Sequence, residues 1–184
     1  LSEGRTGTIE RVALADMLNG SELVFHGSVE SSQSVGVGDV DDIVTRVRFQ
    51  VLDVIKGPAA LRQLDLDFGG GELGGLVLSY SDMSVPSVGE EGVYFVERVS
   101  GQLLNPLYGW AQGHLLVRQG ARGKEIHTYD LRPVYDLQPG LASAPELSAG
   151  TAQGIVTVKT WSRRRPMTLN AFKARLRQMG GATQ

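Results

Sequence analysis

The 184-residue chain contains no cysteine. That absence excludes disulfide bonds, thiolate zinc sites and a cysteine nucleophile. Aromatic residues make up 7% of the chain, and no apolar run approaches the roughly 20 residues that a membrane-spanning helix needs. We therefore expect a water-soluble globular protein, and the length predicts one domain with a core of its own.

The sequence also lacks the common catalytic signatures. It contains no G-x-S-x-G nucleophile elbow, no phosphate loop of the type G-x-x-x-x-G-K-[ST] and no H-E-x-x-H zinc motif. Asp65 and Asp67 would share one face of a strand, but carboxylates two residues apart on an exposed strand more often serve solubility than acid–base catalysis. We expect no enzymatic activity.

A cofactor is not expected either. Residues 69–74, GGGELG, satisfy the dinucleotide pattern G-x-G-x-x-G and follow a predicted strand. The pattern requires a helix to open at its third glycine, however, and the serine-rich segment that follows is stopped by Pro86. A flexible or tightly turning loop is the better interpretation.

Glycine is abundant, with 24 residues spread between short apolar runs, which is typical of a β-rich fold with many turns. The segment 76–88 reads as irregular extended chain. Helical spacing of apolar residues predicts a short N-terminal helix with Thr8 as its N-cap, and a C-terminal helix capped by Thr168. Alternation predicts strands within 22–31, 43–54, 61–68, 89–99 and 154–161, and a hairpin over 114–130.

The second strand changes its alternation halfway along. Apolar residues occupy every second position up to Val51, and then Leu52 and Val54 are apolar instead. One extra residue in a β-bulge has this effect, and Gly27 in the preceding strand is a second place for a bend. Two bending devices predict a strongly curled sheet, of the kind that builds small OB-like barrels.

Composition suggests three parts. Residues 138–150 are rich in Pro, Ala, Ser and Gly and are the best linker candidate. We expect an OB-like β-barrel domain with its N-terminal helix over 1–137, this linker, and a C-terminal strand and basic helix over 151–184 that packs on the barrel.

Charge is unevenly distributed between these parts. All 20 acidic residues lie at or before Glu146, whereas seven of the 18 basic residues follow it. The simplest interpretation is that the basic tail docks on the acidic body or is a solvated basic helix. The alternative is an anionic partner, such as a nucleic acid or a lipid surface, for which Arg163, Arg164 and Arg165 are the candidate contacts.

Several short motifs within 22–97 resemble the netrin-like or TIMP-like OB-fold domains. That family has a strand with G-x-V, a strand that ends in a Lys-Gly step, and a later strand that opens on Gly-Glu and carries a tyrosine before a hydrophobic residue. The matching positions are Gly27 and Val29, then Val51, Val54, Lys56 and Gly57, then Gly89, Glu90, Tyr94 and Phe95.

The resemblance implies a barrel that binds proteins or other macromolecules outside the cytoplasm. Family members that inhibit metalloproteases use an N-terminal cysteine, which this chain lacks, so that mechanism does not carry over. Because the numbering begins at Leu1 rather than a methionine, we expect a processed or trimmed chain. The resemblance implies a bacterial protein that is exported to the periplasm or the cell exterior after removal of a signal.

The expected function is therefore non-catalytic binding of a macromolecular partner, a protein such as a protease, through loops at one barrel end. The alternative is single-stranded nucleic-acid binding by an OB-type groove, with Arg46, Arg48 and Lys56 as its cations. Two observations count against nucleic-acid binding. The part of the chain before the basic tail is net acidic, and alternation places Phe49 on the strand face that points to the core rather than to a groove. A hydrolase with an unrecognised site is the third reading. The candidate contacts in these loops are Gly69, Gly70, Gly71, Glu72, Tyr108 and Trp110.

The histidines offer a weak metal alternative. If the loop of the hairpin over 114–130 has an even number of residues, His114 and His127 lie on the same face, with Asp130 nearby. A metal site usually needs a third ligand at defined spacing, and no such motif is present. We interpret both as surface histidines and expect no metal.

Overall fold

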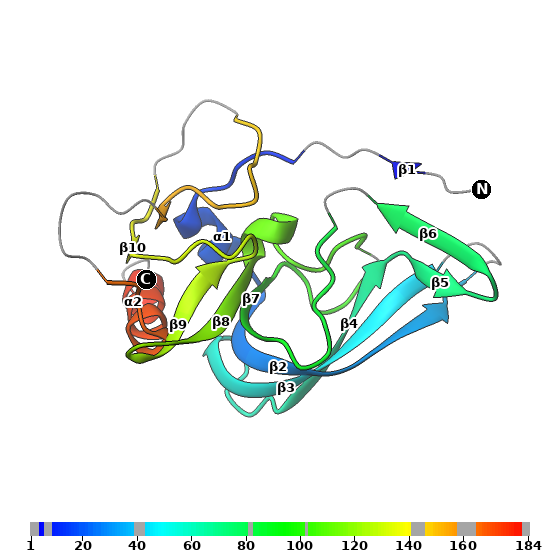
Figure 1. Cartoon of the computed structure of the whole chain (residues 1–184), viewed down its shortest axis with the longest axis horizontal. Coiled ribbons are helices and arrows are strands. Elements are labelled where there is room, and N and C mark those ends of the chain that lie inside the picture. Colours follow the sequence, from blue (N-terminus) through cyan, green and yellow to red (C-terminus); the bar gives the residue numbers. More distant parts are fainter. Residues whose placement is uncertain are drawn as a thin grey trace.

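The computed structural model describes residues 4–5, 9–38, 43–80, 83–101, 103–140, 146–157 and 165–181. The fold is mainly β, with helix α1 (Leu14–Gly20) near the N-terminus and helix α2 (Leu169–Gly181) near the C-terminus (Figure 1). This confirms the predicted class. No helix in these ranges is both long and apolar enough to span a membrane.

Six strands form the main sheet, in the order β4-β3-β2-β7-β8-β9, and every neighbouring pair is antiparallel. Within the described ranges β4 and β9 are its two edges, so no closed barrel is seen. Two smaller sheets have the orders β1-β6-β5 and β10-β11. The strands are β1 (Gly4–Arg5), β2 (Leu23–Gly36), β3 (Ile43–Lys56), β4 (Gln63–Gly69), β5 (Gly71–Leu73), β6 (Leu76–Tyr80), β7 (Glu91–Val96), β8 (His114–Gly120), β9 (Gly123–Thr128), β10 (Asp136–Leu137) and β11 (Ile155–Val156).

The predicted bulge in β3 is confirmed. His26 pairs with Asp53 and Gly27 pairs with Val51, which leaves Leu52 as the extra residue. Gly27 is needed at this point, because a Cβ there would lie 2.6 Å from a backbone oxygen of β3. Two further register shifts flank this one along the same strand pair, and bulges of this kind increase the bend and twist of a ribbon.

Strand β7 and the first half of β2, residues 23–29, are largely buried on both faces. Val24 and Phe95 belong to an apolar cluster that also contains the buried side chains of α1 and α2. Phe25 and Tyr94, which alternate with them, belong to a second cluster with β3 and β4, where Phe49 completes a group of three rings with centroids 4.9 to 5.4 Å apart. Burial on both faces explains the near-continuous apolar runs of these two strands.

The N-terminal helix is shorter than predicted. It begins at Leu14, and the expected cap Thr8 lies outside the described residues. Residues 9–12 are not helical because their backbone pairs elsewhere: the Arg11 amide donates to Glu146 O over 2.7 Å, and Val12 O accepts from the Gln153 amide over 2.8 Å. These bonds tie residues 11 and 12 to Glu146 of the predicted linker and to Gln153 of the predicted C-terminal part.

The C-terminal helix agrees closely with the prediction. Thr168 Oγ1 accepts a hydrogen bond of 3.3 Å from the Ala171 amide, as an N-cap does. Leu169, Phe172 and Leu176 are buried, at the spacing of one helix face. Sequence periodicity therefore identified both the helix and the face that packs on the body.

Candidate partner-binding surfaces

Strands β5 and β6 form a hairpin that the sequence analysis did not predict. Leu73 pairs with Leu76, and the turn between them is Gly74 and Gly75, which have φ values of 59° and 82°. Glycine suits both positions because other residues rarely adopt such angles. The prediction of irregular chain was wrong for residues 76–80, and only 74–75 of the predicted loop are a turn.

The start of the hairpin is fixed to the far end of the β2–β3 ribbon. Thr45 Oγ1 donates to Gly70 O over 2.8 Å, and the Glu72 amide donates to Ser34 Oγ over 3.1 Å. A Cβ on Gly71 would lie 2.6 Å from the same Ser34 oxygen. The glycines that we considered for partner binding thus position the hairpin, and a partner would meet the side chains beyond them.

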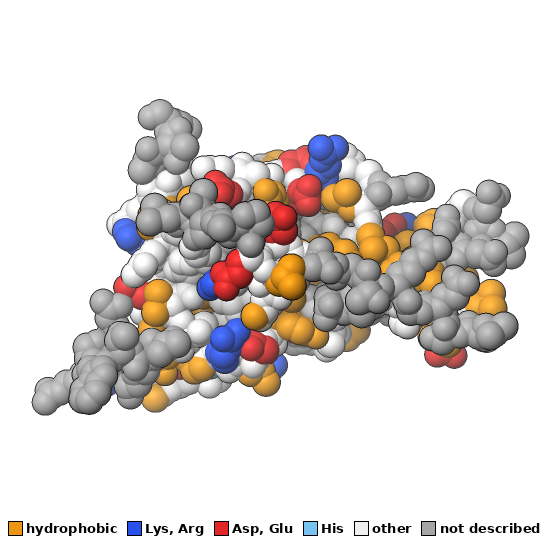
Figure 2. All heavy atoms as spheres, turned by 90° about the horizontal axis from the view of Figure 1, so that it is seen from above, with side chains coloured by type: hydrophobic (Ala, Val, Ile, Leu, Met, Phe, Trp, Pro, Cys, Tyr) orange, Lys and Arg blue, Asp and Glu red, His pale blue; other side chains and the backbone are white. Residues whose placement is uncertain are grey.

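Those side chains are apolar and exposed. Leu73, Leu76 and Val77 retain 42%, 55% and 54% of their accessible surface, and Leu104 retains 39%. Leu73 and Leu76 are paired across the hairpin and share one of its faces, whereas Val77 pairs with Glu72 and lies on the other face. We call these four residues the hairpin surface. Beside it lies a cavity of about 280 Å³ whose lining includes Leu78, Tyr80, Leu103 and Leu104. Figure 2 shows hydrophobic side chains gathered at the end of the molecule that carries β5 and β6.

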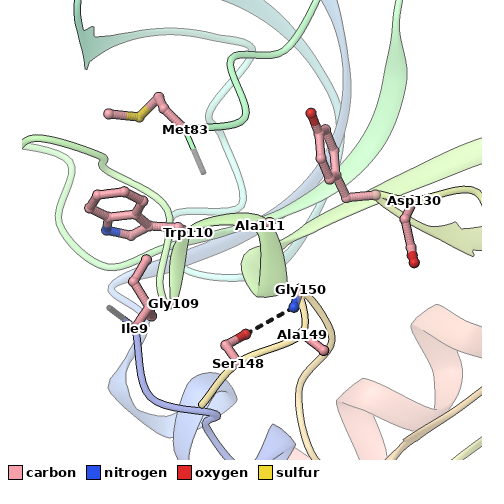
Figure 3. A pocket seen from close by; sticks show the side chains of 10 residues that line it. Ile9, Met83, Gly109, Trp110, Ala111, Asp130, Ser148, Ala149 and Gly150 are labelled. Atoms are coloured by element: carbon pink, nitrogen blue, oxygen red, sulfur yellow. Dashed lines mark hydrogen bonds between the residues drawn. The ribbon is translucent and has the colours of Figure 1, made fainter. Parts of the chain in front are cut away.

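A second hollow, the Trp110 pocket, has a volume of about 490 Å³. Its lining includes Met83, Asp130 and part of η1 (Trp110–Gly113), and Figure 3 shows Met83 and the Trp110 ring toward one side of the pocket and Asp130 toward the other. Trp110 and Leu131 are the two non-glycine residues with a positive φ among the described ones, at 58° and 65°. Of the two aromatic candidates for partner binding, Trp110 lines this pocket, whereas the Tyr108 side chain packs on an apolar core cluster.

The histidine predicted to lie on the surface is buried. The His114 side chain is 0% exposed, because its position in β8 lies opposite Tyr94 of β7, on the face that packs inward. His114 Nε2 lies 2.5 Å from Glu90 Oε1, and Nδ1 lies 3.3 Å from Ser84 Oγ. The surface interpretation was wrong for His114 because β8 is apolar on both faces, so alternation did not reveal its inward side.

Glu90 is held in its ionised form. Burial raises the pKa of its carboxyl, but the hydrogen bond and charge of His114 and the hydroxyl of Tyr94, which donates over 2.9 Å, outweigh burial and lower the pKa below its usual value. Burial and the neighbouring Glu90 raise the pKa of the Tyr94 hydroxyl, so it remains a donor. The carboxylate thus accepts from two buried groups at once.

His127 takes no part in this network. It pairs with Leu116, so it shares a hairpin face with His114, but its Nδ1 is buried and has no hydrogen-bond partner among the described atoms. In the part of the chain that the structure describes, no group of three or more His, Asp or Glu side chains could hold a metal ion.

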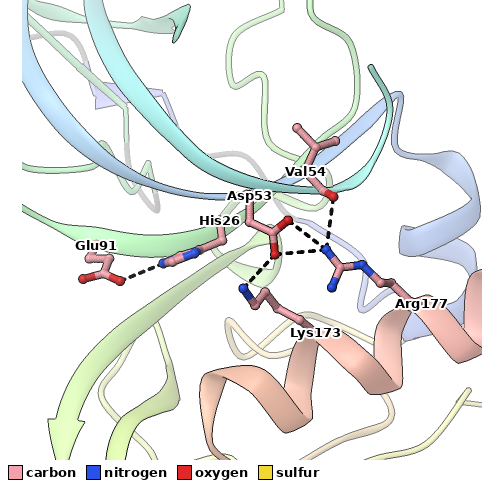
Figure 4. Close-up of polar contacts among 6 residues, drawn as sticks. All are labelled: His26, Asp53, Val54, Glu91, Lys173 and Arg177. Carbon is pink, nitrogen blue, oxygen red and sulfur yellow. Dashed lines mark hydrogen bonds and ion pairs between the residues drawn. The ribbon is translucent and has the colours of Figure 1, made fainter. Parts of the chain in front are cut away.

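Two basic residues of the tail pair with the body (Figure 4). Lys173 Nζ lies 2.7 Å from Asp53 Oδ2, and Arg177 Nη2 lies 2.9 Å from Asp53 Oδ1. Burial raises the pKa of the Asp53 carboxyl, but these two cations lower it more. Arg165 is exposed, and the candidate contacts Arg163 and Arg164 lie outside the described residues.

The cations considered for nucleic-acid binding also have partners within the protein. Arg46 and Arg48 each make two hydrogen bonds to one carboxylate, at 2.8 Å to Asp67 and 2.7 Å to Asp65. Lys56 Nζ donates to two backbone oxygens near the end of α1. Asp65 and Asp67 are therefore ion-paired across strands rather than arranged as a carboxylate dyad.

No protein-family model, curated protein or solved structure matches this chain. A functional assignment consequently depends on the surfaces described above. Among them, the sequence analysis missed the exposed leucines of the hairpin and the grouping of Ser84, Glu90 and His114. The one sequence signal for the hairpin was a Gly-Gly pair between two short apolar runs. No spacing in the sequence predicts that Ser84, Glu90 and His114 meet.

Proposed function

We propose that this protein is a binding module whose hairpin surface docks on a protein partner. The observation that carries the proposal is the exposure of Leu73, Leu76, Val77 and Leu104 at one end of the molecule. Apolar side chains that gather on a surface mark interaction sites more often than scattered ones do. Burial of one large apolar side chain contributes about 1.5–3 kcal/mol, so a partner that covers several of them gains substantial free energy.

The chemistry of the hairpin supports a protein rather than a nucleic acid. Its exposed side chains are aliphatic, whereas proteins that bind single strands stack bases on aromatic rings beside a basic groove. Glu72 adds a negative charge next to them, and Arg46 and Arg48 are already paired with carboxylates. Docking through aliphatic side chains requires no catalytic, aromatic or basic groups on the hairpin.

The proposal also covers the kind of sheet that carries this surface. We propose that the curled sheet is a divergent OB-like sheet of the netrin-like kind and that the protein acts after export. The bulge at Leu52, the close approach at Gly27 and the end of β3 at Lys56 support it, because they lie in the motifs that carry the resemblance.

The test is site-specific cross-linking in the native host. A photoreactive amino acid at position 73, on the same hairpin face as Leu76, should yield a cross-linked protein, and the purified partner should bind the intact protein in solution. Leu76→Asp should weaken that binding at least about tenfold, which corresponds to about 1.4 kcal/mol. Leu52→Asp is the matched control, since Leu52 is similarly exposed but lies on the bulge of β3.

Two results would count against the proposal. One is a partner whose affinity falls equally with Leu76→Asp and with Leu52→Asp. The other is an oligonucleotide that binds tightly, loses affinity steeply with added salt and is insensitive to Leu76→Asp, because that pattern indicates phosphate contacts elsewhere.

A further inference from the structure

A buried polar group lies beside the Trp110 pocket and plays no part in the proposed binding. Ser84 directly follows Met83, which lines the pocket, and the Tyr129 ring, which also lines it, has its centroid 5.3 Å from that of His114. Ser84 is 2% exposed and the His114 side chain is completely buried. Ser84, His114 and Glu90 are not part of the pocket lining, so the group lies behind Met83 and Tyr129, which line a hollow of about 490 Å³, within the size range of small-molecule sites.

The hydrogen bonds define which nitrogen of His114 carries a proton. Glu90 is ionised and can only accept, so the Nε2 atom 2.5 Å from it must donate. In the neutral imidazole the lone pair then lies on Nδ1, which is 3.3 Å from Ser84 Oγ. A carboxylate that fixes the tautomer, a histidine base and a serine hydroxyl are the three parts of an activated nucleophile.

We propose that Ser84, His114 and Glu90 form a nucleophilic triad that hydrolyses small apolar esters entering through the Trp110 pocket. This goes beyond the binding role of the hairpin surface, which involves none of these residues, and it departs from the expectation that the chain has no enzymatic activity. The half-apolar lining of the pocket, with Ile9, Met83 and Trp110, suits an apolar acyl group.

The chemistry needs only the ester and water. Ser84 Oγ attacks the ester carbonyl carbon while its proton passes to His114 Nδ1, and Glu90 stabilises the imidazolium that results. His114 returns the proton to the departing alkoxide as the C–O bond breaks, which leaves an acyl group on Ser84. Water then attacks the acyl-serine, with His114 again taking and returning one proton, and the free acid leaves.

Access to Ser84 requires movement of its cover. Met83, which precedes Ser84 in the chain and lines the pocket, has a flexible, unbranched side chain, so its displacement is the simplest way for a substrate to reach Oγ. Met83→Ala should therefore speed the reaction of Ser84. A purely structural hydrogen-bond network makes the opposite prediction, since Ser84 would stay unreactive in both proteins.

The test uses a fluorophosphonate probe, in which a serine oxygen displaces fluoride from phosphorus, with mass spectrometry to locate the label. We expect label on Ser84, no such label in Ser84→Ala, and unchanged labelling in the matched control Ser87→Ala, an exposed serine of the same loop. Glu90→Gln, which keeps the shape of the side chain, should slow labelling by about 10²-fold or more. The rates at which the native protein and these variants hydrolyse p-nitrophenyl acetate should rank in the same order as their labelling rates.

Absence of label on Ser84 in both the native protein and Met83→Ala overturns the proposal. So does labelling that is equally fast in Glu90→Gln, because the serine would then react without the histidine base. Thermal unfolding of each variant confirms that a lost label reflects lost reactivity rather than lost structure.

Discussion

The long ribbon of β2 and β3 ends in two different ways. At one end α2 covers the ribbon, buries Phe172 in the core and pairs Lys173 and Arg177 with Asp53. At the other end the β5–β6 hairpin covers it, but leaves its own leucines and valine in solvent. Both covering elements come from later in the chain than the ribbon, because β5 begins at Gly71 and α2 at Leu169. Among the described residues, the cover at the α2 end buries its large apolar side chains, whereas the cover at the hairpin end leaves several of them exposed.

The largest expected effect is at the covered end. Phe172→Ala should lower the free energy of unfolding by about 3–5 kcal/mol, because it removes a fully buried ring and leaves a cavity. Urea unfolding followed by circular dichroism measures this, with Leu76→Ala as the control that should change stability by no more than about 0.5 kcal/mol. Equal losses in the two variants would show that the hairpin is as firmly packed as α2, and the contrast between the ends would disappear.

How far sequence reasoning succeeds depends on whether burial follows a simple period. The stripe of α2 repeats at helical spacing, and the extra residue Leu52 breaks a strict alternation, so both were predictable. The β5–β6 hairpin escaped prediction because Leu76 and Val77 are consecutive and both exposed, so neither face of β6 is distinguished by polarity.

The buried group escaped for a different reason. Ser84, Glu90 and His114 meet only through the pairing of β7 with β8 and the path of the loop before β7, and such contacts leave no local pattern. Conversely, Arg46 and Arg48 looked available in the sequence because the carboxylates that neutralise them lie on a neighbouring strand. Candidate functional residues are hence less predictable than the elements that carry them.

The second effect concerns how the hairpin is held. Gly71→Ala should destabilise the hairpin by about 1–3 kcal/mol, because φ is 145° and the new Cβ would meet Ser34 Oγ at 2.6 Å. Amide exchange should accelerate in β5 and β6 and stay unchanged in α2. Gly74→Ala is the comparison, since its Cβ would have open space and only the backbone strain remains. If Gly74→Ala loosens the hairpin more than Gly71→Ala does, the contact with Ser34 does not fix it.

A smaller effect is expected from the ion pairs of α2. Asp53→Asn should cost about 1 kcal/mol, because a partly exposed pair is screened by solvent. The folded-state pKa of Asp53 lies below its ordinary 3.8, so its contribution is present above that value and is lost as the pH falls further, through the folded-state pKa. The stability difference between the native protein and Asp53→Asn, measured by urea unfolding, should therefore be constant near neutrality and shrink below about pH 4.

The smallest effect on stability, and the one most specific to the uncovered end, is expected from Val77→Ser. Val77 is 54% exposed, so removing its methyl groups should change the free energy of unfolding by less than about 0.5 kcal/mol. If a partner buries it, the same substitution weakens the complex by more than it weakens the fold, and the ratio of the two losses measures how much of the side chain the partner covers. A loss of stability above about 1 kcal/mol would instead mean that Val77 already packs within the protein, and the hairpin would then be a cover like α2 rather than a docking surface.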